Sequence, residues 1–233
     1  MKIGVFDSGI GGLTVLEHLK QVLPKEDFIF YADSLHNPYG EKTDEELYKI
    51  TSDIVDFLID KGCRIIVIAC NTATTRCIAY LRSKYPDIVF IGTEPAVKVA
   101  CDGDYHKILI MATPATIQSE RLQILIHENQ KDLNSFYLVS CYGLANAIEN
   151  EDLKRQEEIL SKVYDEYKDQ DIEAIVLGCT HYPLIKDLIA KYFPKAVLLD
   201  GGLGVAKEAK RQMEKHNLIT NKGTADVEFI KTK

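Results

Sequence analysis

The chain has 233 residues, of which 46% are hydrophobic and 27% charged, so it can bury the core of one large domain or two small ones. No apolar run approaches the roughly 20 residues of a membrane-spanning helix, and a net charge of −7 with scattered Lys and Arg argues against a nucleic-acid partner. The N-terminus reaches Asp7 too early for the apolar region of a signal peptide. We therefore expect a cytoplasmic protein with no membrane association.

Strands and helices are predicted to alternate through the first half of the chain. A glycine-rich turn over 7–12 links the first strand to a helix that begins at Leu13, and it lacks the full spacing of nucleotide-binding glycine motifs. Thr43 and Glu46 predict a capping box at the start of the next helix, which ends near Gly62. A third helix is expected over 73–84. The predicted strands of this half are 2–6, 28–32, 64–69 and 88–91.

The second half is predicted to repeat this order, with Pro95 in the first turn of its opening helix. One further helix contains Glu149. The other predicted helices are 117–126, 152–168, 184–192 and 205–215, and the strands are 107–111, 136–140, 173–178 and 196–199. A last strand, 227–230, is expected to return to the first domain. We place the two domains at 1–92 with 203–233 and at 93–202.

Two cysteines occupy matching positions in the two halves. Cys70 and Cys179 each follow an apolar run, while the first strand of each half ends at Asp7 and at Thr113. Both pairs are offset by about 100 residues, which indicates an internal repeat. The sequence thus predicts an α/β fold of two similar, pseudo-symmetric domains, each with a mostly parallel sheet flanked by helices.

Ligands of parallel sheets bind at the carboxyl ends of the strands, so we expect an active site in the cleft between the two domains. Nine polar residues would gather there, namely Asp7, Ser8, Cys70, Asn71, Thr113, Thr116, Cys179, Thr180 and His181. None of them is Lys or Arg, so hydroxyls, the Asn71 amide and helix N-termini would have to hold an anionic group. Asp7 and Glu149 would face an ammonium group. A small amino acid satisfies both sets.

Paired thiols can remove a proton from one face of such a ligand and return a proton to the other, which is the chemistry of a racemase. A free thiol has a pKa near 8.5, so neighbouring groups must favour the thiolate. His181 and the helix N-termini would do so for Cys179, while Asp7 would orient Cys70 or take its proton.

Simpler interpretations compete with this one. Cysteine is among the most often buried residues, and Cys63, Cys77 and Cys101 are expected to fill apolar space. No C-x-x-C pair and no Cys/His spacing of a zinc site is present, so neither a metal nor a redox dithiol is expected. His36 is interpreted as a surface loop histidine.

Five stretches show a resemblance to a known family: Asp7-Ser8-Gly9-Ile10-Gly11-Gly12, Asn37-Pro38-Tyr39-Gly40, Ala69-Cys70-Asn71-Thr72-Ala73, Glu94-Pro95 and Leu177-Gly178-Cys179-Thr180-His181-Tyr182-Pro183-Leu184. Together they resemble the glutamate racemases, cofactor-independent enzymes of the aspartate/glutamate racemase superfamily. Thr180-His181 after the second cysteine is more similar to the glutamate branch than to the aspartate branch.

The resemblance implies interconversion of L- and D-glutamate without a cofactor, with D-glutamate destined for peptidoglycan. Cys70 would act on one enantiomer and Cys179 on the other, assisted by Asp7 and His181. Glu149 matches less closely, because Cys141-Tyr142-Gly143 stands where the family has Cys-Pro. The substrate-contacting positions implied are Ser8, Tyr39, Gly40, Asn71, Thr72, Thr113, Thr116 and Thr180.

Other functions remain open at this point. One alternative is a racemase of aspartate or another small amino acid, and a second is a regulatory protein that binds an acidic ligand without turnover. A third is a sensor in which Cys70 and Cys179 form a disulfide. The expected partner is small-molecule glutamate, and a homodimer is compatible with this interpretation.

Overall fold

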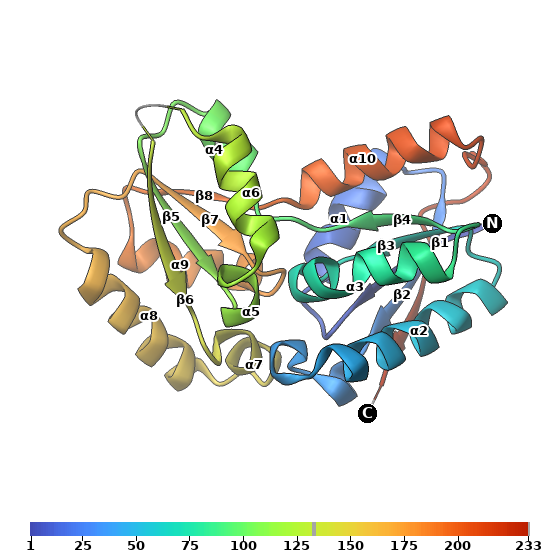
Figure 1. Cartoon of the computed structure of the whole chain (residues 1–233), viewed down its shortest axis with the longest axis horizontal. Coiled ribbons are helices and arrows are strands. Elements are labelled where there is room, and N and C mark those ends of the chain that lie inside the picture. Colours follow the sequence, from blue (N-terminus) through green and yellow to red (C-terminus); the bar gives the residue numbers. More distant parts are fainter. Residues whose placement is uncertain (132–133, 233) are drawn as a thin grey trace. The chain divides into compact units, whose positions relative to one another are not determined.

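The computed structural model describes residues 1–131 and 134–232, which divide into two compact units (Figure 1). Unit 1 comprises Met1–Glu94 with Gly202–Lys233, and unit 2 comprises Pro95–Gly201. The chain therefore leaves unit 1 once and returns to it.

Unit 1 contains a parallel five-stranded sheet in the order β4-β3-β1-β2-β9. Its strands are β1 (Lys2–Asp7), β2 (Asp27–Ala32), β3 (Ile65–Ile68), β4 (Val89–Gly92) and β9 (Val227–Lys231). The last strand pairs with β2, with Phe30 opposite Phe229. The predicted return of the C-terminal strand to the first domain is confirmed.

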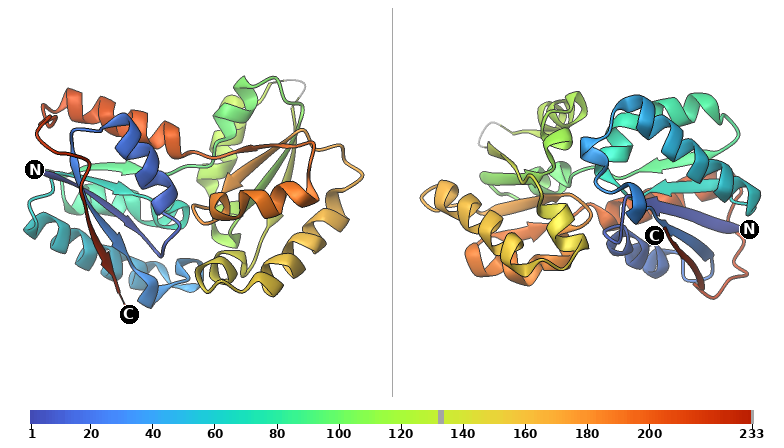
Figure 2. Two further views of the ribbon diagram at one scale, coloured as in Figure 1. Left: turned by 180° about the vertical axis from the view of Figure 1, so that it is seen from behind. Right: turned by 90° about the horizontal axis from the view of Figure 1, so that it is seen from below.

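Helices cover both faces of this sheet, as Figure 2 shows. They are α1 (Leu13–Val22), α2 (Asp44–Asp60), α3 (Asn71–Lys84) and α10 (Gly202–Lys215). Apolar side chains of α1 and α10 pack with Ile3 and Val5 on one face, whereas those of α2 and α3 pack with Phe6 on the other. Successive residues of β1 thus serve opposite cores, because side chains alternate along a strand.

Unit 2 contains a parallel four-stranded sheet in the order β6-β5-β7-β8. Its strands are β5 (Lys107–Ala112), β6 (Ser135–Ser140), β7 (Ala174–Gly178) and β8 (Val197–Leu199). The two sheets share one strand order. When strands are numbered in chain order within each unit, both sheets run fourth, third, first and second from one side, and β9 is an additional strand beside β2 in the first sheet. The prediction of two similar α/β domains with parallel sheets is confirmed.

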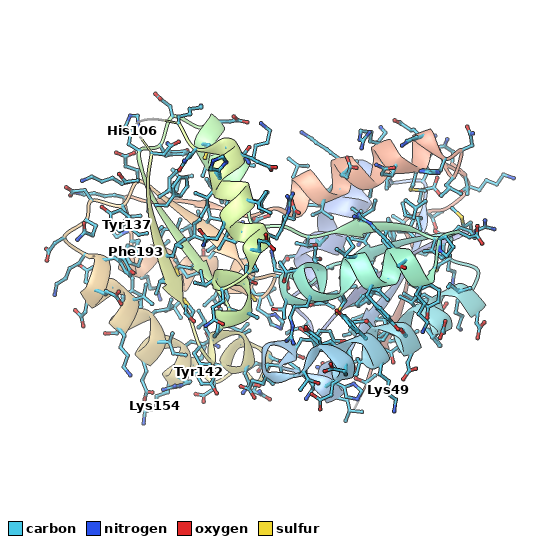
Figure 3. The ribbon with its side chains drawn as sticks, viewed as in Figure 1. Lys49, His106, Tyr137, Tyr142, Lys154 and Phe193 are labelled. Atoms are coloured by element: carbon cyan, nitrogen blue, oxygen red, sulfur yellow. The ribbon has the colours of Figure 1, made fainter. Side chains whose placement is uncertain are left out.

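The helices of unit 2 also lie on both sheet faces. They are α4 (Val97–Asp102), α5 (Pro114–Ile117), α6 (Glu120–Asn129), α7 (Leu144–Glu149), α8 (Leu153–Tyr167) and α9 (Lys186–Tyr192). Apolar residues of α4 and α6 pack on one face, and those of α7, α8 and α9 on the other. Lys154 on α8, like Lys49 on α2 in unit 1, lies on the exposed side of its helix (Figure 3).

Several helix boundaries follow from capping groups. The Thr43 hydroxyl accepts from the Glu46 N–H at 3.2 Å, and the Glu46 carboxylate accepts from the Thr43 N–H at 2.7 Å. This confirms the predicted capping box.

The structure describes no helix among residues 1–131 and 134–232 that has both the length and the apolar character of a membrane span.

Three predicted helices were wrong in detail. The helix expected over 117–126 is two helices, because the Ser119 hydroxyl accepts from the Leu122 N–H and starts α6 separately. Pro95 lies before α4 rather than in its first turn, since Ala96 is the residue that precedes the helix. The helix expected over 184–192 begins as a 3₁₀ turn, Tyr182–Ile185, and becomes α9 at Lys186.

Candidate active site

The two thiols nominated from the sequence lie at equivalent points of the two sheets. In unit 1, Phe6 of β1 is paired with Ile68 of β3, and Cys70 follows two residues later. In unit 2, Ala112 of β5 is paired with Gly178 of β7, and Cys179 follows directly. Each thiol therefore sits at the carboxyl end of the strand beside its unit's first strand, where parallel sheets bind ligands.

In unit 1 a hydrogen-bonded chain connects Cys70 to a buried carboxylate. The Cys70 Sγ lies 3.7 Å from the Ser8 Oγ, which in turn lies 3.3 Å from Oδ1 of Asp7. The relative exposures of Cys70, Ser8 and Asp7 are 5%, 7% and 0%. Because Asp7 is wholly buried yet hydrogen-bonded to the hydroxyl beside the thiol, it is placed to influence the thiol proton through Ser8.

The Asp7 carboxylate also shapes the turn that follows β1. Its two oxygens accept from the backbone N–H groups of Ser8, at 2.7 Å, and of Gly12, at 2.6 Å. A Cβ on Gly12 would lie 2.7 Å from the Asp7 Cβ and 3.0 Å from the Ala69 Cβ. Glycine is therefore required at position 12, because the turn approaches both the carboxylate and the strand that leads to Cys70.

Cys70 is also the N-cap of α3. The Ala73 N–H donates to the Cys70 Sγ at 3.5 Å, so the sulfur faces the positive end of a 14-residue helix. Both the N–H donor and the helix dipole favour the thiolate over the thiol. The next residues, Asn71 and Thr72, form the first turn of α3 and are buried, and the Asn71 side-chain amide donates to the Thr93 carbonyl at 3.5 Å.

Tyr39 and Gly40 lie in a 3₁₀ turn, Tyr39–Glu41, in the loop after β2. Tyr39 is buried in the same apolar cluster as Cys70, whereas Gly40 is exposed. Burial raises the pKa of the Tyr39 phenol well above its usual range, and the charge of Asp33 and a hydrogen bond to it act in the same direction. Tyr39 is thus a neutral phenol in the apolar cluster that contains Cys70.

In unit 2 an imidazole takes the place of the serine. The Cys179 Sγ lies 3.9 Å from Nδ1 of His181, and the His181 Nε2 lies 2.9 Å from Oε2 of Glu149. The imidazole therefore connects the thiol to the carboxylate, which is the order of groups in an activated cysteine nucleophile. Glu149 is the last residue of α7, and this short helix brings it to the histidine.

Thr113 and Thr116 form a pair at the carboxyl end of β5. Their hydroxyl oxygens are 3.1 Å apart, and the Thr113 hydroxyl also accepts from the Thr116 N–H as the cap of α5. Thr180, which follows Cys179 directly, is buried. Since Ala112 and Gly178 are paired, the threonine pair and Cys179 emerge from neighbouring strands at the same sheet edge.

A further thiol of unit 2, Cys141, is buried in the same apolar cluster as Cys179. Burial, with a smaller contribution from Cys179, raises the pKa of Cys141 to about 12, so it remains protonated. Tyr182 is wholly buried there and donates to the Cys141 carbonyl at 3.5 Å. Cys63, Cys77 and Cys101 are buried in apolar clusters, as predicted, and none of the six cysteines forms a disulfide.

One cluster of polar side chains around Tyr39 in unit 1 was not predicted. His36, interpreted from the sequence as a surface loop histidine, has its Nδ1 2.9 Å from both carboxylate oxygens of Asp33. Asp33 is buried and also accepts from the Tyr39 hydroxyl at 2.7 Å. The only indication of this cluster in the sequence was the position of Asp33 directly after β2.

Among residues 1–131 and 134–232, no group of three or more His, Cys, Asp or Glu side chains is arranged to hold a metal ion.

Comparison with known proteins identifies the family of this chain. Residues 3–209 match the sequence profile of the family described as Asp/Glu/Hydantoin racemase. The chain belongs to this racemase family. A glutamate racemase of Clostridium perfringens is 40% identical over 232 residues, which cover 97% of this chain and 89% of that protein.

Solved structures of this racemase family share the fold. The glutamate racemase isoform RacE1 of Bacillus anthracis aligns with a TM-score of 0.85 at 29% identity, covering 100% of this chain and 88% of the other. The glutamate racemase of Francisella tularensis, solved in complex with D-glutamate, aligns with a TM-score of 0.82 at 31% identity and the same coverages. The racemase relatives are isomerases that act on amino acids, and the chain is a member of that enzyme class.

Proposed function

We propose that this racemase interconverts L- and D-glutamate by two-base proton transfer at Cα, with Cys70 and Cys179 as the bases. The observation that carries the proposal is the equivalent placement of the two buried thiols, each at the carboxyl end of the strand next to the first strand of its own sheet. Repetition of a reactive group in two similar units fits a reaction whose substrates are mirror images of one another. Glutamate is proposed because the relatives compared above are glutamate racemases.

Each thiol has the neighbours that its proton transfers require. In one direction the Cys70 thiolate removes the Cα proton and becomes a thiol, while the Cys179 thiol donates its proton to the opposite face of the carbanion and becomes a thiolate. The reverse direction exchanges these roles. Ser8 with Asp7, and His181 with Glu149, would then restore the starting protonation of each sulfur, so no cofactor has to take part in the proton transfers.

The substrate would be held without a Lys or Arg side chain among the nominated contacts. Its carboxylates would accept from hydroxyls, the Asn71 amide and backbone N–H groups, and its ammonium group would face Asp7 or Glu149. The proposed contacts are Ser8, Tyr39, Gly40, Asn71, Thr72, Thr113, Thr116 and Thr180. The product D-glutamate would supply cytoplasmic synthesis of peptidoglycan.

The direct test is incubation of the purified, reduced protein with L-glutamate in D2O. We expect D-glutamate to form with deuterium at Cα, as followed by chiral chromatography and mass spectrometry. Absence of both products would contradict the proposal. A parallel panel of aspartate and other small amino acids distinguishes glutamate from the alternative substrates, and binding of glutamate without isotope exchange would favour a regulatory protein instead.

Substitution of each thiol tests the mechanism. Cys70→Ser and Cys179→Ser should each abolish turnover in both directions, because racemization needs both bases. Cys63→Ala and Cys101→Ala are matched controls, since these buried thiols lie in apolar clusters and should leave turnover close to that of the unmodified protein. Full turnover in either serine variant would rule out a mechanism with two essential thiols.

A further inference from the structure

Asp33 is a buried carboxylate that the proton transfers do not use. It directly follows β2, is 1% exposed, and makes side-chain contacts with three residues. Oδ1 lies 2.9 Å from His36 Nδ1 and 3.1 Å from Thr232 Oγ1, and Oδ2 lies 2.9 Å from His36 Nδ1 and 2.7 Å from the Tyr39 hydroxyl. A buried carboxylate is costly unless such partners satisfy it, so its presence here calls for an explanation.

The contact with Tyr39 links Asp33 to the candidate active site. The Tyr39 hydroxyl has one proton, and donation of that proton to Asp33 leaves its oxygen able to accept but not to donate elsewhere. Tyr39 is buried in the same apolar cluster as Cys70, and the charges of Cys70 and Asp7 both contribute to the raised pKa of Tyr39. The hydrogen bond to Asp33 therefore uses the only proton of the Tyr39 hydroxyl and leaves its oxygen as an acceptor.

The contact with Thr232 links the same carboxylate to the strand that returns from the far end of the chain. The Thr232 N–H donates to the Ala32 carbonyl at 3.0 Å, which continues the pairing of β9 with β2. Its hydroxyl lies beside Asp33 and accepts from the Leu35 N–H at 2.9 Å. Thr232 thus fastens the start of the loop that carries Tyr39 and Gly40, across 199 positions of sequence.

A similar contact at the other end of β2 offers an internal comparison. Glu26, also 1% exposed, accepts from the Thr220 hydroxyl at 2.7 Å and from the Thr220 N–H at 2.8 Å. Both threonines join the C-terminal segment to a buried carboxylate beside β2. They differ in place, because Glu26 precedes β2 and Asp33 follows it at the edge where ligands of parallel sheets bind.

We propose that Asp33 is a positioning residue for glutamate binding, which holds Tyr39 and is itself held by Thr232 of the C-terminal segment. The proposal rests on the function proposed above, because it takes Tyr39 and Gly40 as substrate contacts. Asp33 acts through Tyr39 and does not touch the reacting atoms.

A double-mutant cycle separates this role from a purely structural one. Asp33→Ala and Tyr39→Phe should each raise the KM for glutamate by roughly tenfold, with smaller effects on kcat, since a lost hydrogen bond to a charged group is of that size. If Asp33 acts through the Tyr39 hydroxyl, the double variant should be little worse than either single variant. Asp33→Asn, whose amide oxygen can still accept from Tyr39, should restore most of the affinity.

The two threonines supply a matched pair that avoids removing a buried charge. Thr232→Val and Thr220→Val should lower the midpoint of urea unfolding by similar amounts, because each removes a hydroxyl from a buried carboxylate. Only Thr232→Val should raise KM, by several-fold. This comparison decides the question if Asp33→Ala does not fold.

The outcomes are distinct from those that test the racemase activity. Absence of turnover in the unmodified protein counts against the racemase proposal, and the same cycle is then measured as the Kd for glutamate by calorimetry. If the protein turns over and the increases in KM caused by Asp33→Ala and Tyr39→Phe multiply in the double variant, the positioning role is overturned. Equal changes in KM for Thr232→Val and Thr220→Val would overturn the contribution of the C-terminal segment.

Discussion

The Nε2 atom of His181 lies 2.9 Å from Oε2 of Glu149, and the two side chains are 2% and 7% exposed. A carboxylate at this distance orients the imidazole and stabilises its protonated form. The other ring nitrogen, Nδ1, is the one near the Cys179 thiol. Glu149 can therefore influence Cys179 through the histidine, although its sequence context matched the family less closely than that of the other residues.

Glu149→Gln tests this influence. The amide keeps the size of the side chain but carries no charge, so His181 becomes a weaker base for the Cys179 proton. We expect kcat to fall by about tenfold to hundredfold, as is typical when a group that orients a functional histidine is replaced. Steady-state rates in both directions measure the effect. Glu157→Gln, on the exposed surface of α8, is the control and should leave kcat unchanged.

Ser8→Ala tests the corresponding chain in unit 1. The hydroxyl joins the Cys70 sulfur to Asp7, and alanine removes it without adding bulk. We expect kcat to fall by about tenfold, in the lower part of the range for groups that assist proton transfer. The isotope effect on Cα–H removal should increase for the enantiomer on which Cys70 acts. Equal isotope effects for the two enantiomers would show that Ser8 does not serve Cys70 specifically.

The position of the two thiols was predictable, because it depends on local sequence patterns. A continuous apolar strand followed by a small residue, a cysteine and a hydrogen-bonding residue is visible within each half. Repetition of this pattern indicated similar parallel sheets. The capping box of Thr43 and Glu46 was predictable for the same reason, since both of its hydrogen bonds lie within four residues.

The Asp33 cluster was not predictable, because its partners are distant in sequence. Thr232 reaches Asp33 only through the pairing of β9 with β2, and the register of that pairing follows from the packed sheet rather than from a local motif. The division of the helix expected over 117–126 was missed for another reason. Apolar periodicity continues through Ser119, and the cap at that serine decided the boundary instead.

Gly12→Ala tests the close approach of the turn after β1. The added methyl group would lie 2.7 Å from the Asp7 Cβ, a separation that real Cβ atoms essentially never show. We expect the free energy of unfolding to fall by about 1–3 kcal/mol, the usual cost of overpacking, with a loss of activity because Asp7 must move. Gly204→Ala in α10 is the control. Its Cβ meets nothing within 4 Å, so urea unfolding should show equal or greater stability.

Glu228 on β9 predicts a dependence of stability on pH. Hydrogen bonds from Lys2 at 2.7 Å and Lys61 at 2.8 Å lower the pKa of Glu228 from 4.5 to about 2. The pKa of Glu228 is lower in the folded protein than in the unfolded chain, so its charged form stabilises the fold. This stabilisation is complete above about pH 4.5 and is lost as the pH falls through about 2.

Thermal unfolding of Glu228→Gln beside the unmodified protein measures this dependence. The difference in Tm should be present at pH 7, shrink between pH 4.5 and 2, and be smaller at high salt, because the carboxylate is partly exposed to solvent. A difference that stayed constant over this range would show that the two lysines do not bind the charged form preferentially.

The most direct test of the central claim is the exchange of Cα hydrogen in the two single-thiol variants. Cys70→Ser and Cys179→Ser are incubated in D2O with pure L-glutamate and, separately, with pure D-glutamate, and deuterium at Cα is measured by mass spectrometry. Under the proposal each thiolate serves one side of Cα, so the two-base account predicts no racemization in either variant. It also predicts that any residual exchange occurs with one enantiomer in Cys70→Ser and with the opposite enantiomer in Cys179→Ser. Exchange of both enantiomers at similar rates in one variant would contradict it.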